Sequence, residues 1–263
     1  MQSIFDDLEL PKDFLFQVIS LFICILFVHT FYLLFIEPSA AEQFLLAANE
    51  NRAPDRTLTV ILKDFEQEVC IMFFFWALSI IFLKWRDISD QSKLLKINLL
   101  DENINEINKE QAINYLEETN KFLLNNPNKI LPRCIWSGLN SFIISNEVAD
   151  AALSTHGTCN NEAERMESEL SMIRYIIWAI PSIGFIGTVR GIGEALSQAH
   201  LAVEGDIAGM TASLGIAFNS TFVALVISIL LMFFLHQLQL VQDRLFLDVH
   251  DYCDKKLLSQ LIK

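Results

Sequence analysis

The chain has 263 residues, of which 52% are hydrophobic, and its mean hydropathy is +0.37. This apolar content is high for a soluble domain and favours a membrane protein. The formal net charge of −13 provides no basic surface, which argues against a nucleic-acid partner.

Four apolar runs predict an all-α membrane protein with four transmembrane helices and a cytoplasmic helical insert between spans two and three. The expected segments are an N-terminal cytoplasmic segment (1–13), the first span (14–36), a periplasmic segment (37–68), the second span (69–85), a cytoplasmic helical domain (86–172), the third span (173–200), a periplasmic turn (201–206), the fourth span (207–236) and a cytoplasmic tail helix (237–263).

The first span is expected to end at Pro38, because proline cannot continue a helix. His29 lies in the middle of this span and suggests either a proton relay or a histidine bonded to a neighbouring backbone or hydroxyl group. The second interpretation is favoured because the span holds no other ionisable group.

The insert has periodic apolar residues that predict helices, with breaks expected at residues 125–128, Pro132, Gly138 and residues 155–161.

Positive charge predicts how the chain is oriented. Lysine and arginine flank the insert sides of spans two, three and four, at Lys84, Arg86, Lys93, Arg165, Arg174 and Arg244, whereas the turn 201–206 has neither. Because positive residues favour the cytoplasmic side, both termini and the insert are expected in the cytoplasm.

The third and fourth spans each carry a face of small residues. On helices, one face holds Pro181, Gly184, Thr188, Gly191 and Ala195, with Gly187 nearby, and the other holds Ser213, Ala217, Thr221, Ala224 and Ser228. Small faces let membrane helices approach closely. The threonines place hydroxyl groups where a neighbouring helix or a hydrated ion could meet them.

Polar residues inside the same spans need a separate explanation, because they are costly in a membrane. Arg190 and Glu194 form a possible i, i+4 charge pair at a pore mouth, and Asn219 and Ser220 adjoin Thr221. Isolated histidines, five scattered cysteines without a CxxC pair and no phosphate-binding loop argue against an enzyme or a metal site. No cofactor is expected.

PSIGFIGTVRGI (181–192) and LGIAFNSTFVALVISI (214–229) resemble the MotA/TolQ/ExbB proton-channel family. The GTVxGI motif is similar to that of the TolQ and ExbB branch, while four spans resemble the MotA layout. Two positions depart from the family pattern: Arg190 stands where an apolar residue is common, and Asn219–Ser220 replaces apolar residues.

The resemblance implies a homopentameric ring in the inner membrane of a bacterial cell, driven by an ion-motive force. Its third and fourth helices would line a pore for H⁺ or Na⁺, with Thr188, Thr221, Ser220 and Asn219 facing the ion path. A dimer of a single-span partner similar to ExbD, TolR or MotB would carry the titrating aspartate and act on the cell envelope. In such a pore, Gly191→Leu would leave the ring intact and block function.

Two alternatives stay open from the residues: a stand-alone membrane channel, or a scaffold in which the glycines serve only helix packing. A stand-alone channel would need its own acidic residue in the middle of the membrane. Spans three and four offer only Glu194, near one end, which favours a partner that supplies the carboxylate.

Overall fold

The computed structural model describes residues 12–49, 54–95 and 106–261. Over these residues the fold is almost entirely helical and contains no β-strand, apart from an isolated bridge between Ile107 and Leu261. The expected N-terminal segment falls outside the described residues except for its last two, as do residues 96–105 of the insert and residues 262–263 of the tail.

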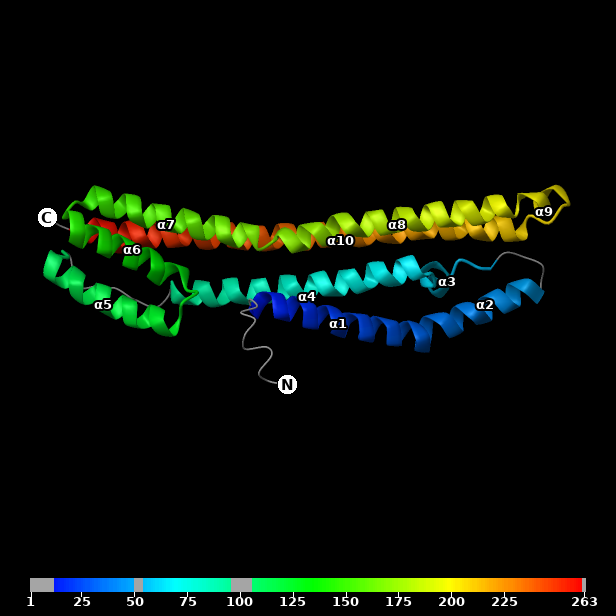
Figure 1. Cartoon of the computed structure of the whole chain (residues 1–263), viewed down its shortest axis with the longest axis horizontal. Coiled ribbons are helices and arrows are strands. Elements are labelled where there is room, and N and C mark those ends of the chain that lie inside the picture. The colour runs from blue at the N-terminus through cyan, green and yellow to red at the C-terminus, as the bar shows by residue number, and fades with distance from the viewer. Residues whose placement is uncertain (1–11, 50–53, 96–105, 262–263) are drawn as a thin grey trace. The chain divides into compact units, whose positions relative to one another are not determined.

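The helices follow one another in the order shown in Figure 1. The α-helices are α1 (Lys12–Phe31), α2 (Glu37–Asn49), α3 (Leu58–Leu62), α4 (Phe65–Leu94), α5 (Lys109–Asn125), α6 (Ile130–Ser145), α7 (Val148–Ser168), α8 (Ser171–Ser197), α9 (Ala199–Val203) and α10 (Ala208–Tyr252). Short π- or 3₁₀-helical segments are η1 (Tyr32–Ile36), η2 (Cys253–Leu257) and η3 (Leu258–Gln260).

Four helical stretches are long and apolar enough to cross a membrane: Phe14–Ala47, Phe65–Leu94, Val148–Ser197 and Ala208–Gln260. The chain is therefore an all-α membrane protein, as its composition predicts. It divides into two compact units, residues 1–81 with 172–235 and residues 82–171 with 236–263. We describe each unit separately.

In the first unit, the first helical stretch of the chain does not stop at Pro38, where the sequence predicts its end. The chain stays helical from Lys12 to Asn49, and the π-helical turn η1 ends two residues before the proline. A regular α-helix would bring the proline ring against the carbonyl group of Leu34. A wider turn at this place eases such a clash, so the expected helix end is wrong.

The first unit also contains α8 and the first part of α10, which run side by side in Figure 1. They are joined by α9 and a turn in which Gly205 has a φ of 97°, a conformation that glycine adopts without strain. Buried isoleucines of α8 at 173, 176, 177 and 180 line its contact face on one half of the helix. Glycines and Ala195 occupy the other half.

The second unit is a helical bundle around buried apolar side chains of α6, among them Ile135, Leu139 and Phe142. Asn108 begins α5 with a capping box, and Asn146 ends α6 in the left-handed conformation. Polar contacts join α6 to α7, including Ser137 Oγ to Ser154 Oγ at 2.7 Å and an ion pair of Arg133 with Glu162.

Only one of the breaks expected in the insert is present. The stretch 125–128 separates α5 from α6, but Pro132 lies in the first turn of α6, where a missing N–H leaves no bond unmade. Gly138 lies inside α6, where a Cβ would collide with Thr155 of α7. Residues 155–161 are helical within α7. Pro132 does not break α6 because it lies in the first turn, and Gly138 does not break it because α7 packs closely against it.

Candidate functional site

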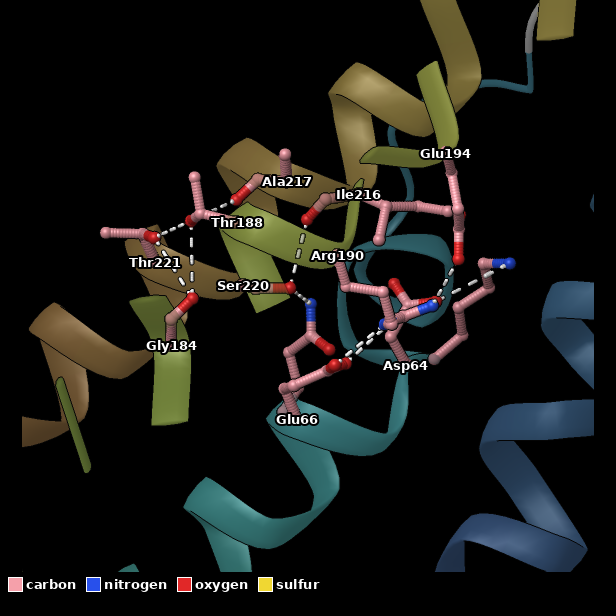
Figure 2. Close-up of polar contacts among 12 residues, drawn as sticks. Asp64, Glu66, Gly184, Thr188, Arg190, Glu194, Ile216, Ala217, Ser220 and Thr221 are labelled. Atoms are coloured by element: carbon pink, nitrogen blue, oxygen red, sulfur yellow. Dashed lines mark hydrogen bonds and ion pairs between the residues drawn. The ribbon is translucent and has the colours of Figure 1, made fainter. Parts of the chain in front are cut away.

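Thr188 of α8 and Thr221 of α10 meet in the first unit, and their hydroxyl groups contact each other (Figure 2). The Thr188 hydroxyl lies 3.0 Å from the carbonyl oxygen of Ala217 and 3.3 Å from that of Gly184. The Thr221 hydroxyl lies 3.2 Å from the same Gly184 oxygen. The sequence analysis places one threonine on each small face and predicts that both face an ion path; their contact with each other is a finding of the structure.

Two hydroxyl groups carry two protons, whereas their four mutual and carbonyl contacts would need four donated hydrogens. The pair can therefore exchange between several hydrogen-bond arrangements without moving a helix. Both threonines are half-buried, so one side of the pair stays accessible. Such a pair can accept a hydrogen bond from a hydrated ion or a protonated carboxyl group.

The close approach of α8 and α10 depends on glycine. A Cβ on Gly191 would lie 2.8 Å from the Ala217 nitrogen and 2.9 Å from the Ser213 oxygen. A Cβ on Gly184 would collide with the Ala224 side chain and lie 3.0 Å from the Ser220 oxygen. Backbone atoms cannot move aside as a flexible side chain can, so these positions exclude larger residues.

The small faces thus contact each other within one chain. Seven of their members are buried: Gly184, Gly191, Ala195, Ser213, Ala217, Ala224 and Ser228. The expectation that Gly191 faces a pore is not supported, because the space where its side chain would lie is filled by α10 of the same chain. Gly187 is also buried, and a Cβ there would lie 2.6 Å from Ser220 Cβ.

Pro181 interrupts the hydrogen bonds of α8 and leaves the carbonyl group of Ile177 without its usual helical donor. Ser228 of α10 provides that donor, with its hydroxyl 3.0 Å from the Ile177 oxygen. In a membrane such a substitute matters because no water can solvate a free carbonyl group. Ser228 therefore compensates for the hydrogen bond that Pro181 removes, and both residues lie on the predicted small faces.

Arg190 pairs with more than its predicted partner. Its guanidinium is 3.0 Å from Glu194, as the i, i+4 spacing predicts, and its Nε and Nη2 lie 2.8 Å from the two carboxylate oxygens of Glu66 (Figure 2). Asp64 lies 3.9 Å away. The sequence analysis missed Glu66 and Asp64, which precede or begin α4, and no local spacing connects them with α8.

The side chains of three consecutive residues, Glu66, Gln67 and Glu68, contact three different helices. Glu66 pairs with Arg190 of α8, Gln67 donates to the Ser220 hydroxyl of α10 at 3.3 Å, and Glu68 lies 2.7 Å from Nδ1 of His29 in α1. Successive residues on a helix point about 100° apart, which explains the three directions. We call these three residues the α4 hub.

The hub changes two interpretations made from the sequence. Ser220 is 1% exposed and faces Gly187 and Gln67, so it does not lie on an open surface of the described chain. His29 is bonded to a carboxylate, not to a backbone or hydroxyl group. Asn219 is half-buried next to Ser220.

Asp64 lies just before α4 and is the least satisfied acid of the group. Its Oδ2 is buried with no hydrogen-bond partner, while Oδ1 is 3.8 Å from the Lys63 ammonium. Burial raises the pKa of the Asp64 carboxyl, although Lys63 and Arg190 act in the opposite direction. Among the described residues, no three His, Cys, Asp or Glu side chains are arranged to hold a metal ion.

The fold and the paired threonine helices define a helical membrane protein with an intramembrane polar contact. Residues 126–250, which are 125 of the 263, match the sequence model of the MotA/TolQ/ExbB proton channel family. This match confirms the resemblance that the motifs of this part of the chain show. No curated protein and no solved structure shows significant similarity to the chain.

Thr188, Thr221 and Arg190 lie inside the matched region, whereas His29 and the α4 hub lie outside it. The family match thus covers the threonine pair but not three of the four carboxylates that surround Arg190 and His29. The hub could not be found from family motifs.

Proposed function

We propose that the chain is the ring subunit of an ion-motive-force-driven channel that powers a partner acting on the cell envelope. The ring is a homopentamer in a bacterial inner membrane, with both chain termini in the cytoplasm. It conducts H⁺ or Na⁺, uses no cofactor and catalyses no covalent chemistry. The match of residues 126–250 to a proton channel family supports this function in outline.

The contact of Thr188 with Thr221 is the observation that carries the proposal. It provides two half-buried hydroxyl groups that can reorient, at the place where the sequence resembles the channel motif. Within the described chain, the hydrogen bonds of these hydroxyl groups go to each other or to backbone carbonyl groups. A titrating group would therefore come from outside the chain.

The partner is a dimer of a single-span protein similar to ExbD, TolR or MotB, whose aspartate meets the threonine pair. When protonated, that aspartate donates to a hydroxyl; when ionised, it accepts from one. The threonines can serve both states because each hydroxyl is donor and acceptor. Arg190 and Glu194 stay at the pore mouth in this proposal and keep their charges paired.

Thr188→Val and Thr221→Val test the proposal, since both substitutions remove a hydroxyl and nearly conserve volume. We expect ion flux in partner-containing proteoliposomes to fall about tenfold or more, as a hydrogen bond to a charged group contributes about 1.5–3 kcal/mol. Thr211→Val is the matched control, because Thr211 on α10 is exposed and its hydroxyl donates to the carbonyl oxygen of Ile207, the residue directly before this helix.

Unchanged flux in both threonine variants, with the ring intact, would remove the pair from the ion path.

A stand-alone channel is a second candidate, and buried acids of α4 are the observation that favours it. Glu66 and Glu68 are nearly buried, so the first unit has carboxylates of its own outside α8 and α10. Flux through the chain reconstituted without a partner, lost in Glu68→Gln and kept in Thr188→Val, would establish this function. A chain silent in both preparations, whose threonine variants have no phenotype in cells, would instead be a scaffold.

A further inference from the structure

Three cysteines that lie far apart in the sequence converge in the second unit. Cys134 belongs to α6, Cys159 to α7 and Cys253 to η2, and each of these residues is at most 1% exposed. All three are free thiols in the structure. The contacts between the three elements show how the thiols come together.

Hydroxyl contacts set the register of α6 against α7. The Thr158 hydroxyl donates to the Ser137 hydroxyl at 2.8 Å, and the Ser141 hydroxyl donates to the carbonyl oxygen of Asp150 at 3.1 Å. Residue numbers rise along α6 while those of the facing residues fall along α7, so the two helices run antiparallel. This register determines which other residues of the two helices face each other.

Cys134 and Cys159 face each other in this register. One helical turn away, Gly138 packs so closely against Thr155 that a Cβ on the glycine would collide with the threonine hydroxyl. Cys134 is four residues before Gly138, and Cys159 is four residues after Thr155. The antiparallel helices therefore bring the two thiols to the same level, and a side-chain hydrogen bond joins them.

Cys253 approaches the pair from the C-terminal part of the chain. Leu257 of η2 lies 3.1 Å from the position that a Cβ on Gly138 would take, and Cys253 is four residues before Leu257. The Cys253 side chain interacts electrostatically with both Cys134 and Cys159. Because the hydrogen bond joins Cys134 to Cys159, these two sulfur atoms are the pair placed to react with each other.

The surroundings of the pair suit a disulfide better than a metal ion. A disulfide requires Cβ atoms about 3.5–4.5 Å apart, and the close approach of α6 to α7 at Gly138 allows such a distance one turn away. Within the described residues, no three potential ligands are arranged to hold a metal ion. A buried cysteine can serve as a small apolar side chain, but two thiols in contact across two helices can also form a bond.

We propose that Cys134 and Cys159 form a reversible disulfide that cross-links α6 to α7 under oxidising conditions. With hydrogen peroxide as the oxidant, both S–H bonds and the O–O bond of the peroxide break, one S–S bond forms, and two water molecules are released. A dithiol reductant restores both thiols by disulfide exchange. This site belongs to the second unit and does not depend on the proposed channel function.

The cross-link closes a loop over residues 134–159, which contains most of α6 and the first half of α7. Closing this loop restricts the unfolded chain and so stabilises the folded unit. Because both thiols are buried, an oxidant reaches them only when the bundle opens locally, and we expect cross-linking to take minutes to hours. In a reducing compartment the bridge forms only under oxidative conditions.

The test counts free thiols in the full chain, purified in mild detergent and treated with hydrogen peroxide. The chain is then denatured, labelled with a maleimide and analysed by mass spectrometry. The sequence has five cysteines, so we expect five labels before treatment, three after it, and five again after reduction with dithiothreitol. Peptide mapping should locate the link between Cys134 and Cys159, and the melting temperature should rise by about 5 °C or more.

Cys159→Ala should keep all four of its labels after treatment, with no change in its melting temperature. Cys253→Ala is the matched control, because Cys253 is equally buried in the same cluster, and this variant should still fall from four labels to two. Five labels on the treated wild-type chain would overturn the proposal and leave the cysteines as packing residues. So would a disulfide that includes Cys253 or joins two chains. If Cys159→Ala does not fold, the peptide map of the wild-type chain still decides.

Discussion

Arg190 holds its positive charge between carboxylates from two helices. The Glu66 side chain is 7% exposed and the Arg190 side chain 40% exposed, so the acid depends on the pair more than the base does. A buried charge whose partner is removed destabilises a fold much more than an exposed one. The Arg190–Glu194 contact, in contrast, joins two side chains that are both about 40% exposed.

We therefore expect Arg190→Met to destabilise the first unit by about 2–4 kcal/mol, because it leaves Glu66 buried without a partner. Glu194→Gln should cost less than about 1 kcal/mol, as exposed ion pairs contribute little. Thermal unfolding in detergent measures both. Adding Glu66→Leu to Arg190→Met should recover part of the loss; a double variant less stable than Arg190→Met would contradict this account.

Asp64 provides a pH-dependent test. Its folded pKa is raised, so ionisation is less favourable in the folded chain than in the unfolded chain. The Asp64 carboxyl contributes most to the free energy of unfolding at pH values below its unfolded pKa. That contribution is lost as the pH rises through its folded pKa. Asp64→Asn should accordingly raise the melting temperature near neutral pH and have little effect at the lowest tolerated pH. If Asp64→Asn raised the melting temperature only at acidic pH, the direction assigned to the Asp64 pKa would be wrong.

At the scale of elements, the contact of α8 with α10 depends on a few positions without side chains. Gly191 and Gly193 are two residues apart on α8, yet a Cβ on Gly191 meets backbone atoms within 3 Å whereas one on Gly193 meets nothing within 4 Å. Substituting each glycine in turn therefore distinguishes an effect on the contact between α8 and α10 from any other effect of a larger side chain.

Gly191→Leu should prevent stable pairing of α8 and α10, with loss of the folded chain and of any ring. Gly193→Leu should leave the chain folded, since leucine also favours a helix by about 1 kcal/mol over glycine. Size-exclusion chromatography and thermal unfolding would report both. A folded, assembled Gly191→Leu variant without ion flux would instead restore the interpretation that Gly191 faces a pore.

The elements that the sequence predicts well are those whose signal extends over a whole helix. Apolar runs located the four membrane-crossing stretches, and the threonine spacing placed Thr188 and Thr221 on their helices. Local signals were less informative: Pro38 and residues 155–161 lie inside helices because wider turns and packing compensate. Glu66 is 124 residues from Arg190, so no periodic pattern relates them.

At the scale of the whole molecule, α8 and α10 present large exposed apolar side chains beyond their shared contact. Phe185, Ile186, Phe218 and Phe222 are each more than 60% exposed, although they flank the buried small faces. In a single chain these groups would all face lipid. In a ring, some of them would pack against neighbouring subunits.

We expect native mass spectrometry in several mild detergents to show a pentamer, which for chains of 30.0 kDa has a mass of about 150 kDa. The buried small faces do not drive this assembly, because α8 and α10 already cover them within one chain. Substituting Phe185 by Ala should weaken the pentamer while the folded chain persists. A monomer or dimer in all detergents would exclude the ring.

The α4 hub limits how the first unit can change shape. Three consecutive side chains hold α8, α10 and α1, so turning α4 by the angle of a single residue would break all three contacts together. These three contacts join α4 to each of the other three membrane-crossing stretches. If transport involves movement, we expect that movement to leave these three contacts intact and to take place between chains or against a partner.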